Sequence, residues 1–268
     1  MTSQELMKII KTRRSVRTFD GRKISAEHRE KLEAYIKDIK NPYNIPVRFV
    51  LLEGDKAQDI CSPVIEGEDL YVAAIIPNVP HSEEAFGFSF EKLVIFAWSL
   101  GIGTTWIAAS MKRDAFENAV GKKDNEFMYC ISPLGYPAQV MSDKETHFRN
   151  GLHADERKPA DELFFDGKLG TSLNTDNEDI KMALEAVRLA PSAVNYQPWR
   201  IVKSGNSFHF YEEHTESLAG IAPWDVQKID MGIALCHFLS IVDGECAIEN
   251  PGISVPDGTE YVATITIC

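Results

Sequence analysis

The chain has 268 residues, of which 44% are hydrophobic and 25% are charged, the composition of an ordinary globular protein. Its formal net charge is −12, and no basic run is longer than the pairs Arg13-Arg14 and Lys122-Lys123. Nucleic acid and membranes are therefore poor partners, and the length suits one large core or two fused halves.

The first part of the chain predicts alternating helices and strands. Residues 3–11 form a short helix with Ser3 as its cap, and Ser25 caps a second helix that ends before Pro42. A strand follows at 47–54, and a later strand at 126–137 carries a turn at its end.

Between these strands, residues 93–111 contain no charged side chain, and nineteen residues are long enough to span a bilayer. Gly101 and Gly103 interrupt this segment and two threonines follow, which is poor helix material at the depth where lipid tolerates polar groups least. We therefore expect a buried helix that ends near Leu100 in place of a membrane span.

The second part of the chain repeats this order. Helix, strand, long apolar helix and strand are predicted at residues 177–190, 199–205, 226–244 and 259–267. An offset of 152 residues places Leu32 on Leu184 and Pro46 on Pro198. We predict a duplicated domain with its boundary in the charged stretch 142–179; the alternative is chance agreement among common helix residues.

The cysteines are five in number and scattered, which predicts reduced thiols in the cytosol. The N-terminus has no apolar stretch ahead of a small-residue cleavage site, so secretion is not expected. No Cys/His ligand spacing, His-Glu-x-x-His or Gly-x-Ser-x-Gly motif occurs, and we expect neither a metal site nor a serine nucleophile.

Three segments carry polar groups of possible function. "RRSVR" sets three guanidinium groups around Ser15 in an acidic chain, which suits a phosphate or a solvated basic face. "LGIGTTWIAAS" suits a chain reversal against a planar ligand or a glycine-capped helix end. "APSAVNYQPW" suits a helix stop, or a loop whose amides read the edge of a heteroaromatic ring.

Together, "RRSVRTFDGRKIS", "SLGIGTTWIAAS", "LGYP", "ERKPADELF" and "APSAVNYQPWR" closely resemble the FMN-dependent nitroreductase family over nearly the whole chain. The resemblance implies an α+β fold with a mixed or antiparallel sheet flanked by helices. In that family two subunits form an intimate homodimer and bind FMN across the interface. Hydride passes from NADH or NADPH through flavin N5 to a nitroaromatic or quinone acceptor in ping-pong turnover.

Carried onto this chain, the resemblance assigns three groups of cofactor-binding residues. The phosphate end would be held by Arg13, Arg14, Ser15, Arg17 and Arg157. The ring would be lined near N5 by Trp106, Ile107 and Ala108, with a main-chain N–H of Ile107 or Ala108 bonded to N5. The ring edge and ribityl hydroxyls would be contacted by Pro191, Ser192, Ala193, Asn195 and Gln197.

The order of the motifs departs from the family. An early P-S-x-x-N is missing and occurs only in the second half, where the arginines are absent and "IVDGECAIENPG" replaces the ring-facing motif. We therefore expect a fused pseudo-dimer with halves 1–160 and 161–268, one FMN per chain, and a molecule that is mostly monomeric and acts on small molecules. The alternatives are a flavin-binding redox sensor without efficient turnover and a dehalogenating or flavin-consuming relative.

Overall fold

The computed structural model describes residues 1–67, 70–218, 220 and 222–267, so that Cys268 lies outside the described residues. The chain folds into two compact units. The continuous unit comprises Thr12–Leu152, and the discontinuous unit comprises Met1–Lys11 together with His153–Cys268. The division into halves 1–160 and 161–268, which was inferred from the sequence repeat, is a separate matter and stays a prediction.

The continuous unit contains four helices and four strands among its described residues. In chain order they are α2 (Ala26–Lys37), β1 (Arg48–Glu53), β2 (Leu70–Pro77), α3 (Ser82–Ser99), α4 (Arg113–Ala119), β3 (Glu126–Phe127), β4 (Ile131–Pro133) and α5 (Asp143–Gly151).

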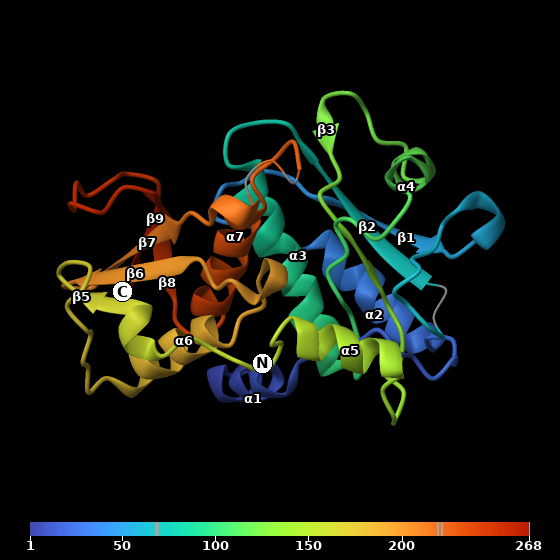
Figure 1. Ribbon diagram of the computed structural model, residues 1–268, viewed down its shortest axis with the longest axis horizontal. Coiled ribbons are helices and arrows are strands. Elements are labelled where there is room, and N and C mark those ends of the chain that lie inside the picture. Colours follow the sequence, from blue (N-terminus) through green and yellow to red (C-terminus); the bar gives the residue numbers. More distant parts are fainter. Residues whose placement is uncertain (68–69, 219, 221, 268) are drawn as a thin grey trace. The chain divides into compact units, whose positions relative to one another are not determined.

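Strand β2 organises the sheet of this unit. It pairs antiparallel with β1, with Arg48 opposite Ile75, and its other edge pairs with β3 and β4. All of its residues except the last are buried, because α3 packs on the sheet and α2 packs on α3 (Figure 1). The sequence prediction missed β2, because a run buried on both faces lacks the alternation that marks a half-buried strand.

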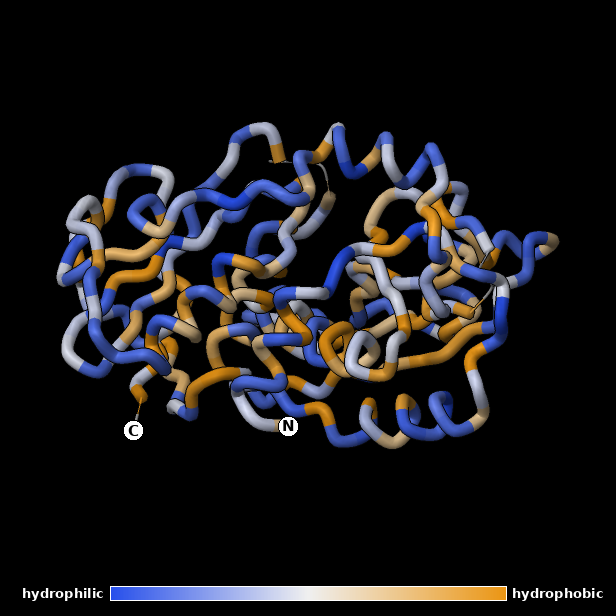
Figure 2. The backbone as a smooth tube through the Cα atoms, turned by 90° about the horizontal axis from the view of Figure 1, so that it is seen from below, coloured by the Kyte–Doolittle hydropathy of each residue, from blue (hydrophilic) through white to orange (hydrophobic). Residues whose placement is uncertain are grey.

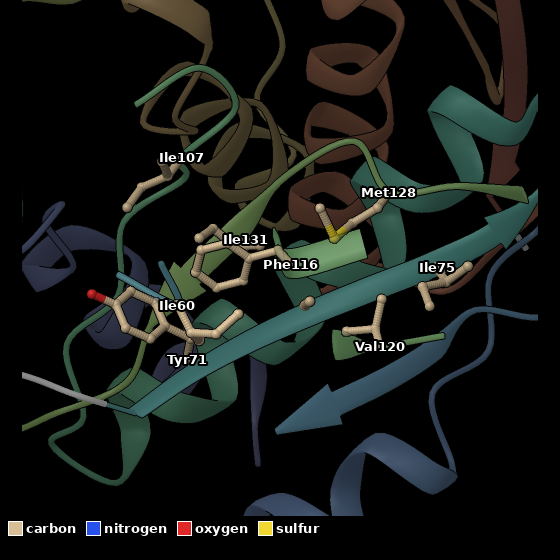
Figure 3. Packing of buried hydrophobic residues seen from close by; sticks show 9 residues of the cluster. Ile60, Tyr71, Ile75, Ile107, Phe116, Val120, Met128 and Ile131 are labelled. Carbon is tan, nitrogen blue, oxygen red and sulfur yellow. The ribbon is translucent and has the colours of Figure 1, made fainter. Parts of the chain in front are cut away.

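The core of this unit lies between the sheet and the segments that cover it. Tyr71 and Ile75 of β2 pack with Phe116 of α4 and with Ile107 and Ile131 (Figure 3). The rings of Tyr71 and Phe116 meet edge to face, with centroids 5.5 Å apart. Burial of these side chains, at roughly 1.5–3 kcal/mol each, holds the loop after α3 against the sheet.

The predicted helix ends of the continuous unit are confirmed. The Ser25 side chain accepts a hydrogen bond from the His28 N–H at 3.2 Å and caps α2. Helix α3 ends at Ser99 but begins at Ser82, ahead of the charge-free segment. Among residues 1–67, 70–218, 220 and 222–267, no helix combines the length and apolar character needed to cross a bilayer.

The discontinuous unit contains three helices and five strands among its described residues. In chain order they are α1 (Ser3–Thr12), β5 (Phe164–Asp166), α6 (Glu178–Arg188), β6 (Trp199–Ser204), β7 (Ser207–Glu213), α7 (Val226–Leu239), β8 (Gly244–Ala247) and β9 (Thr259–Ile267).

The strands of this unit form one mixed sheet in the order β5-β6-β7-β9-β8. Strand β5 runs parallel to β6, and every other pair is antiparallel. Helices α6 and α7 pack together and α7 packs on β6 and β7 (Figure 1). The predicted α+β class with a mixed or antiparallel sheet flanked by helices is therefore confirmed, although β5, β7 and β8 were not predicted.

The cap of α1 differs from the prediction. Thr2, and not Ser3, accepts a hydrogen bond from the Glu5 N–H, and the Glu5 side chain accepts one from the Thr2 N–H in return. This reciprocal pair is a capping box, and it leaves the Ser3 hydroxyl to donate to the Ile241 carbonyl at 2.9 Å.

Hydrophobic residues recur along the helices and strands of both units, whereas most loops are hydrophilic (Figure 2).

The two units share part of their element order. Helices α2 and α6 begin at Ala26 and Glu178, which the offset of 152 residues places on each other. Strands β1 and β6 begin within one residue of that offset, and each pairs antiparallel with the next strand in the chain. This recurrence supports the proposed duplication.

Candidate functional site

Three of the predicted motifs meet in the continuous unit. Val16 of "RRSVR" donates its N–H to the Thr104 carbonyl at 2.8 Å, and Gly103 donates its N–H to the Gly135 carbonyl of "LGYP" at 2.7 Å. Asp20 donates its N–H to the Tyr136 carbonyl at 2.9 Å. The segment around Ser15 is thereby fixed against the loop that follows α3.

Glycine is required at positions 101 and 103 of "LGIGTTW" for different structural reasons. Gly101 has φ +74° and ends α3, because its N–H and that of Ile102 each bond a carbonyl of the last helical turn at 2.9 Å. A Cβ on Gly103 would lie 2.8 Å from the Val16 side chain. Only glycine at position 103 lets the arginine segment approach this closely.

Arg13 is buried and is balanced by a carboxylate from α3. Its side chain is 5% exposed, and its Nε lies 4.0 Å from Oε1 of the fully buried Glu91. Burial lowers the pKa of Arg13, opposed by the negative charge of Glu91. The other oxygen of Glu91 accepts a hydrogen bond from the Trp106 indole N–H at 3.1 Å. One carboxylate therefore orients both Arg13 and Trp106.

Arg14 is paired in the same way with α5. Its guanidinium donates to Oε1 of Glu145, while Oε2 accepts the main-chain N–H groups of Arg17 and Thr18 at 3.0 and 2.8 Å. Glu145 is fully buried. Arg14 thus serves the fold of the segment, and Glu145 is the residue that holds the segment in place.

Arg17 lies among positive charges. Its guanidinium carbon is 5.2 Å from the centre of the Phe148 ring. Burial lowers the pKa of Arg17; the negative charge of Glu145 opposes this shift, and the positive charge of Arg149, which also lowers the pKa of Arg13, adds to it. We call Arg13, Arg17 and Arg149 the cationic cluster; Glu91 and Glu145 offset part of its charge, and a bound anion would offset more.

Two buried polar atoms beside this cluster make no hydrogen bond with the residues that the structure describes. They are Nε of Arg13 and Oγ1 of Thr105. Buried polar groups in folded proteins are almost always paired. The Arg13 Nε–H and the Thr105 hydroxyl have no hydrogen-bond partner among the described residues, and they belong to two motifs that touch each other. A polar ligand with anionic oxygens fits these groups.

Of the two main-chain N–H groups predicted to contact the flavin, those of Ile107 and Ala108, the first is already used within the fold. The Ile107 N–H donates to the Ile131 carbonyl at 2.9 Å, and the Ile131 N–H returns a bond at 3.0 Å. Ile107 is therefore fixed to the sheet, with its side chain in the core (Figure 3). Ala108 follows it and is exposed, so its N–H is the candidate for a ligand contact.

In the discontinuous unit, the loop after α6 has an unusual backbone. Val194, Asn195 and Gln197 have φ of +43°, +62° and +53°. Asparagine tolerates this region, whereas a β-branched residue such as valine is strained there. Such strain persists only where the surroundings over-determine the conformation, and it is common at ligand sites.

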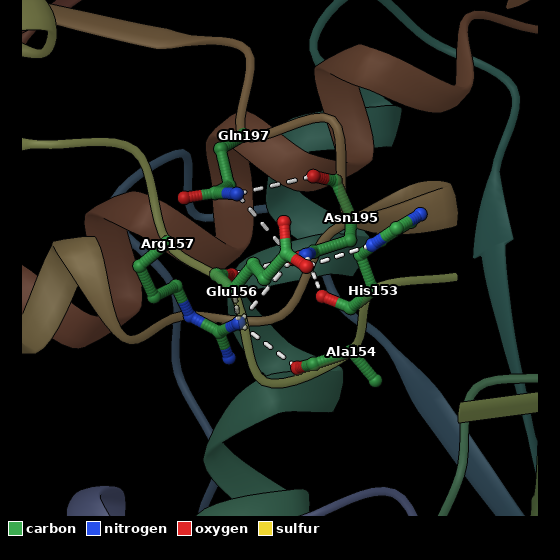
Figure 4. Close-up of polar contacts among 6 residues, drawn as sticks. All are labelled: His153, Ala154, Glu156, Arg157, Asn195 and Gln197. Atoms are coloured by element: carbon green, nitrogen blue, oxygen red, sulfur yellow. Dashed lines mark hydrogen bonds and ion pairs between the residues drawn. The ribbon is translucent and has the colours of Figure 1, made fainter. Parts of the chain in front are cut away.

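Side-chain bonds fix this loop to residues 153–158 (Figure 4). The Asn195 amide donates to the carbonyls of His153 and Glu156 at 2.7 and 3.1 Å, and its oxygen lies 3.4 Å from the Arg157 guanidinium. Gln197 accepts the Lys158 N–H at 2.9 Å. Arg157, Asn195 and Gln197 were predicted to touch a ligand, and the structure brings them together as the frame of the loop.

Two further contacts complete the loop. The Ser192 hydroxyl accepts the Gln197 N–H at 2.9 Å. The Ala193 N–H donates to both oxygens of Asp230 in α7, at 3.0 and 3.1 Å. Asp230 is 3% exposed, and burial raises its pKa well above the ordinary range. A buried carboxyl group thus holds the loop at the residue before its strained turn.

The strain at Val194 can be tested by substitution. Val194→Gly should raise the free energy of unfolding by about 1 kcal/mol, because a left-handed backbone costs an L-residue roughly 1–2 kcal/mol and glycine loses part of that gain as entropy. Chemical denaturation measures the change. Val140→Gly, at a 79% exposed position, is the control and should lower stability slightly. A loss of stability in Val194→Gly would contradict the strain.

The predicted residues therefore fall into one set per unit, and each set is held by residues that the sequence reasoning missed. Glu91 and Glu145 hold the first set, Arg149 extends it, and Asp230 holds the second. Glu91 and Asp230 had a signal, since each is a lone acidic residue inside an apolar helical run. Glu145 and Arg149 had none, because charged side chains are ordinary in a charged helix.

Comparison with known proteins gives a consistent result. A family model described as "Putative TM nitroreductase" matches residues 5–241. A solved "putative nitroreductase" from Thermotoga maritima superposes with a TM-score of 0.58 and 21% identity, over 100% of this chain and 94% of the other. At that identity the likeness shows the fold alone.

Two smaller proteins match about half of the chain. An FMN-dependent nitroreductase from Clostridium difficile has a TM-score of 0.42 and 16% identity, covering 51% of this chain and 92% of its own. An iodotyrosine deiodinase bound to FMN and 3-iodo-L-tyrosine has a TM-score of 0.44 and 17% identity, covering 51% and 92%. No curated protein matches this chain.

Proposed function

The chain belongs to the "Putative TM nitroreductase" family, and from this membership we propose that it is an FMN-dependent NAD(P)H oxidoreductase that reduces nitroaromatic or quinone-type acceptors. The observation that carries the proposal is the cationic cluster of Arg13, Arg17 and Arg149 around the predicted phosphate segment. Glu91 and Glu145 balance part of this positive charge, and a flavin phosphate would balance more of it.

The two sets of residues are proposed to be the two walls of one crossed flavin site. The continuous unit would contribute Arg13, Arg17, Ser15 and the Trp106–Ala108 segment, and the discontinuous unit would contribute the loop 191–197. This is the arrangement of a dimeric nitroreductase fused into one chain. The recurrence of α2–β1 as α6–β6 supports it, as does the presence of each motif in one unit only.

Each residue then has a definite task. Arg13 and Arg17 would bind the phosphate, while Arg14 and Glu145 keep the segment in shape. When bound, FMN would accept a hydride from NADH or NADPH and pass two electrons to the acceptor. The exposed Ala108 main-chain N–H would orient the ring, because the Ile107 N–H is already bonded to Ile131.

The loop 191–197 would act mainly through its backbone. The Asn195 and Gln197 side chains bond to residues 153–158, so the surface that they hold in place is the main chain of Ser192 and Ala193. Arg157 would fix Asn195 in the same framework, in addition to any contact with the phosphate. A rigid, pre-formed loop loses little entropy when a ligand binds.

Anaerobic reduction tests the proposed activity. Purified protein loaded with FMN should bleach on addition of NADH or NADPH, and the flavin band should return when a nitroaromatic or a quinone is added. Bleaching without recovery by either acceptor would favour the dehalogenating or sensing alternatives. A flavin that neither NADH nor NADPH reduces would contradict the proposed oxidoreductase.

The crossed site predicts that variants in opposite units share one defect. Arg17→Ala and Asn195→Ala should each raise the dissociation constant for FMN about tenfold or more. The first removes a charge-assisted hydrogen bond to the phosphate, worth roughly 1.5–3 kcal/mol, and the second removes the bonds that hold the loop 191–197 in shape. Arg22→Ala and Asn206→Ala, at exposed positions, are the matched controls. FMN affinity that falls in Arg17→Ala and is unchanged in Asn195→Ala would limit the site to the continuous unit.

A further inference from the structure

The discontinuous unit contains a second group of polar side chains, away from the loop 191–197 in sequence. Glu212 is the residue before the last in β7, His214 follows that strand, and Asp225 precedes α7. One ligand atom from each of these residues lies within 4.8 Å of the others. The group combines two carboxylates with one imidazole and plays no part in the proposed flavin site.

Glu212 is the unusual member of this group. It is 0% exposed, yet neither carboxylate oxygen has a hydrogen-bond partner among the described residues. Nδ1 of His214 lies 2.8 Å from its Oε1 but outside hydrogen-bonding geometry. A buried carboxylate without hydrogen bonds is costly unless a cation meets it.

His214 is arranged as metal-binding histidines are. Its Nδ1 faces Glu212, while its Nε2 lies 3.3 Å from Oε2 of Glu260 in β9. A ligating histidine usually donates its other ring N–H to a carboxylate, which fixes the ring and makes the free nitrogen a better ligand. Glu260 is held in turn by Lys228, whose Nζ lies 3.3 Å from Oε1.

Asp225 supplies one oxygen to the fold and keeps the other available. Its Oδ1 accepts the Gln227 N–H at 2.9 Å and caps α7. The Gln227 side chain ties the start of α7 to the end of β7, since it accepts the Thr215 N–H at 2.7 Å and donates to the Glu213 carbonyl at 3.2 Å. The three candidate ligands are therefore presented by a fixed strand end and a fixed helix start.

We propose that Glu212, His214 and Asp225 bind a divalent metal ion of the zinc class, with three protein ligands and a fourth position open to water. Imidazole with carboxylates suits zinc and its neighbours better than magnesium or calcium, which prefer oxygen alone. Ligand atoms of tetrahedral zinc stand about 3.3–3.5 Å apart, so the 2.8 Å pair of Glu212 and His214 must open slightly, and ligand atoms as far apart as 4.8 Å must approach each other. The half-exposed His214 side chain can make that movement.

The site would link metal binding to the loop 191–197. Helix α7, which Asp225 caps, also carries Asp230, the residue that accepts the Ala193 N–H. An ion bound at the start of α7 would join that helix to β7 close to the hydrogen bonds that Gln227 makes with Glu213 and Thr215. We therefore expect a metal-loaded protein to unfold at a higher temperature than the same protein after chelation.

Titration with zinc tests the site directly. The full-length protein is treated with EDTA, exchanged into metal-free buffer and titrated with ZnCl2 by calorimetry, and then with CoCl2 to record the visible bands of a low-symmetry site. We expect one ion per chain with a dissociation constant below about 10 µM. Glu212→Gln and His214→Ala should each weaken binding at least tenfold, and Glu260→Gln should weaken it about 10–100-fold through His214.

One control variant and one property of the Glu212→Gln variant make the result decisive. Glu216→Gln removes an exposed carboxylate from the same loop and should bind zinc as the unaltered protein does. Glu212→Gln keeps the shape of the side chain and removes a buried charge, so it should fold at least as well in the absence of metal. Zinc binding that is weaker than about 1 mM, or that survives both Glu212→Gln and His214→Ala unchanged, would overturn the proposal.

Discussion

Replacing Glu145 by alanine should lower the free energy of unfolding by about 3–5 kcal/mol, the cost of breaking a buried ion pair by removing one partner. Glu145 is fully buried and satisfies three donors at once: the Arg14 guanidinium and the N–H groups of Arg17 and Thr18. Alanine would leave all three part-buried donors without this acceptor.

Chemical denaturation of the metal-free, flavin-free protein measures this effect. Glu145→Gln should lose less than alanine, because its amide oxygen still accepts one main-chain N–H. Glu27→Ala, which breaks the exposed pair with Lys31 on α2, is the control and should change stability by less than about 1 kcal/mol. A loss in Glu145→Ala no larger than this control would mean that the arginine segment is held by its main-chain contacts alone.

Replacing Asp230 by alanine should weaken FMN binding roughly 5–150-fold. The Ala193 N–H would lose its acceptor, and an unsatisfied buried donor costs about 1–3 kcal/mol. The loop carries three residues with positive φ and can relieve their strain once the contact is gone. The effect should therefore be a change in the loop, with little change in the rest of the unit.

Asp230→Asn separates positioning from charge. Asparagine retains one oxygen for the Ala193 N–H and should bind FMN within a few-fold of the unaltered protein. Asp243→Ala removes an exposed carboxylate just beyond α7 and serves as the control. Equal FMN affinity in Asp230→Ala and the control would show that the loop keeps its conformation without this contact.

The helices were the most predictable part of this fold. Ser25 and Asn177 begin α2 and α6 as polar caps, and Gly101 ends α3 with a left-handed backbone, so local chemistry alone marks the ends. Strands β2 and β7 were missed for a different reason. Their burial comes from helices that pack on them from elsewhere in the chain, and no local pattern reports such a contact.

The motifs of the site could be predicted from the sequence, whereas the residues that hold those motifs in place could not. Sequence placed "RRSVR", "GIGTT" and "LGYP" in one function, and the structure joins them by main-chain bonds. It did not reveal that Arg14 is neutralised by Glu145, since those residues are 131 positions apart. Nor did it show that Asn195 and Gln197 turn toward residues 153–158, because a polar side chain in a loop has no preferred partner until the chain is folded.

The predicted motifs are divided between the two units of this chain. The proposed consequence is that one flavin site survives where a symmetric dimer has two. A reduced set of cofactor residues would then be a result of fusion, and each remaining residue would have no second copy to compensate for its loss.

The number of flavins bound by one chain tests this central proposal most directly. Apoprotein titrated with FMN, followed by gel filtration and absorption at the flavin band against total protein, gives the ratio. A fused pseudo-dimer with a single surviving site predicts one FMN per chain. Two FMN per chain, or none after incubation with excess FMN, would contradict it.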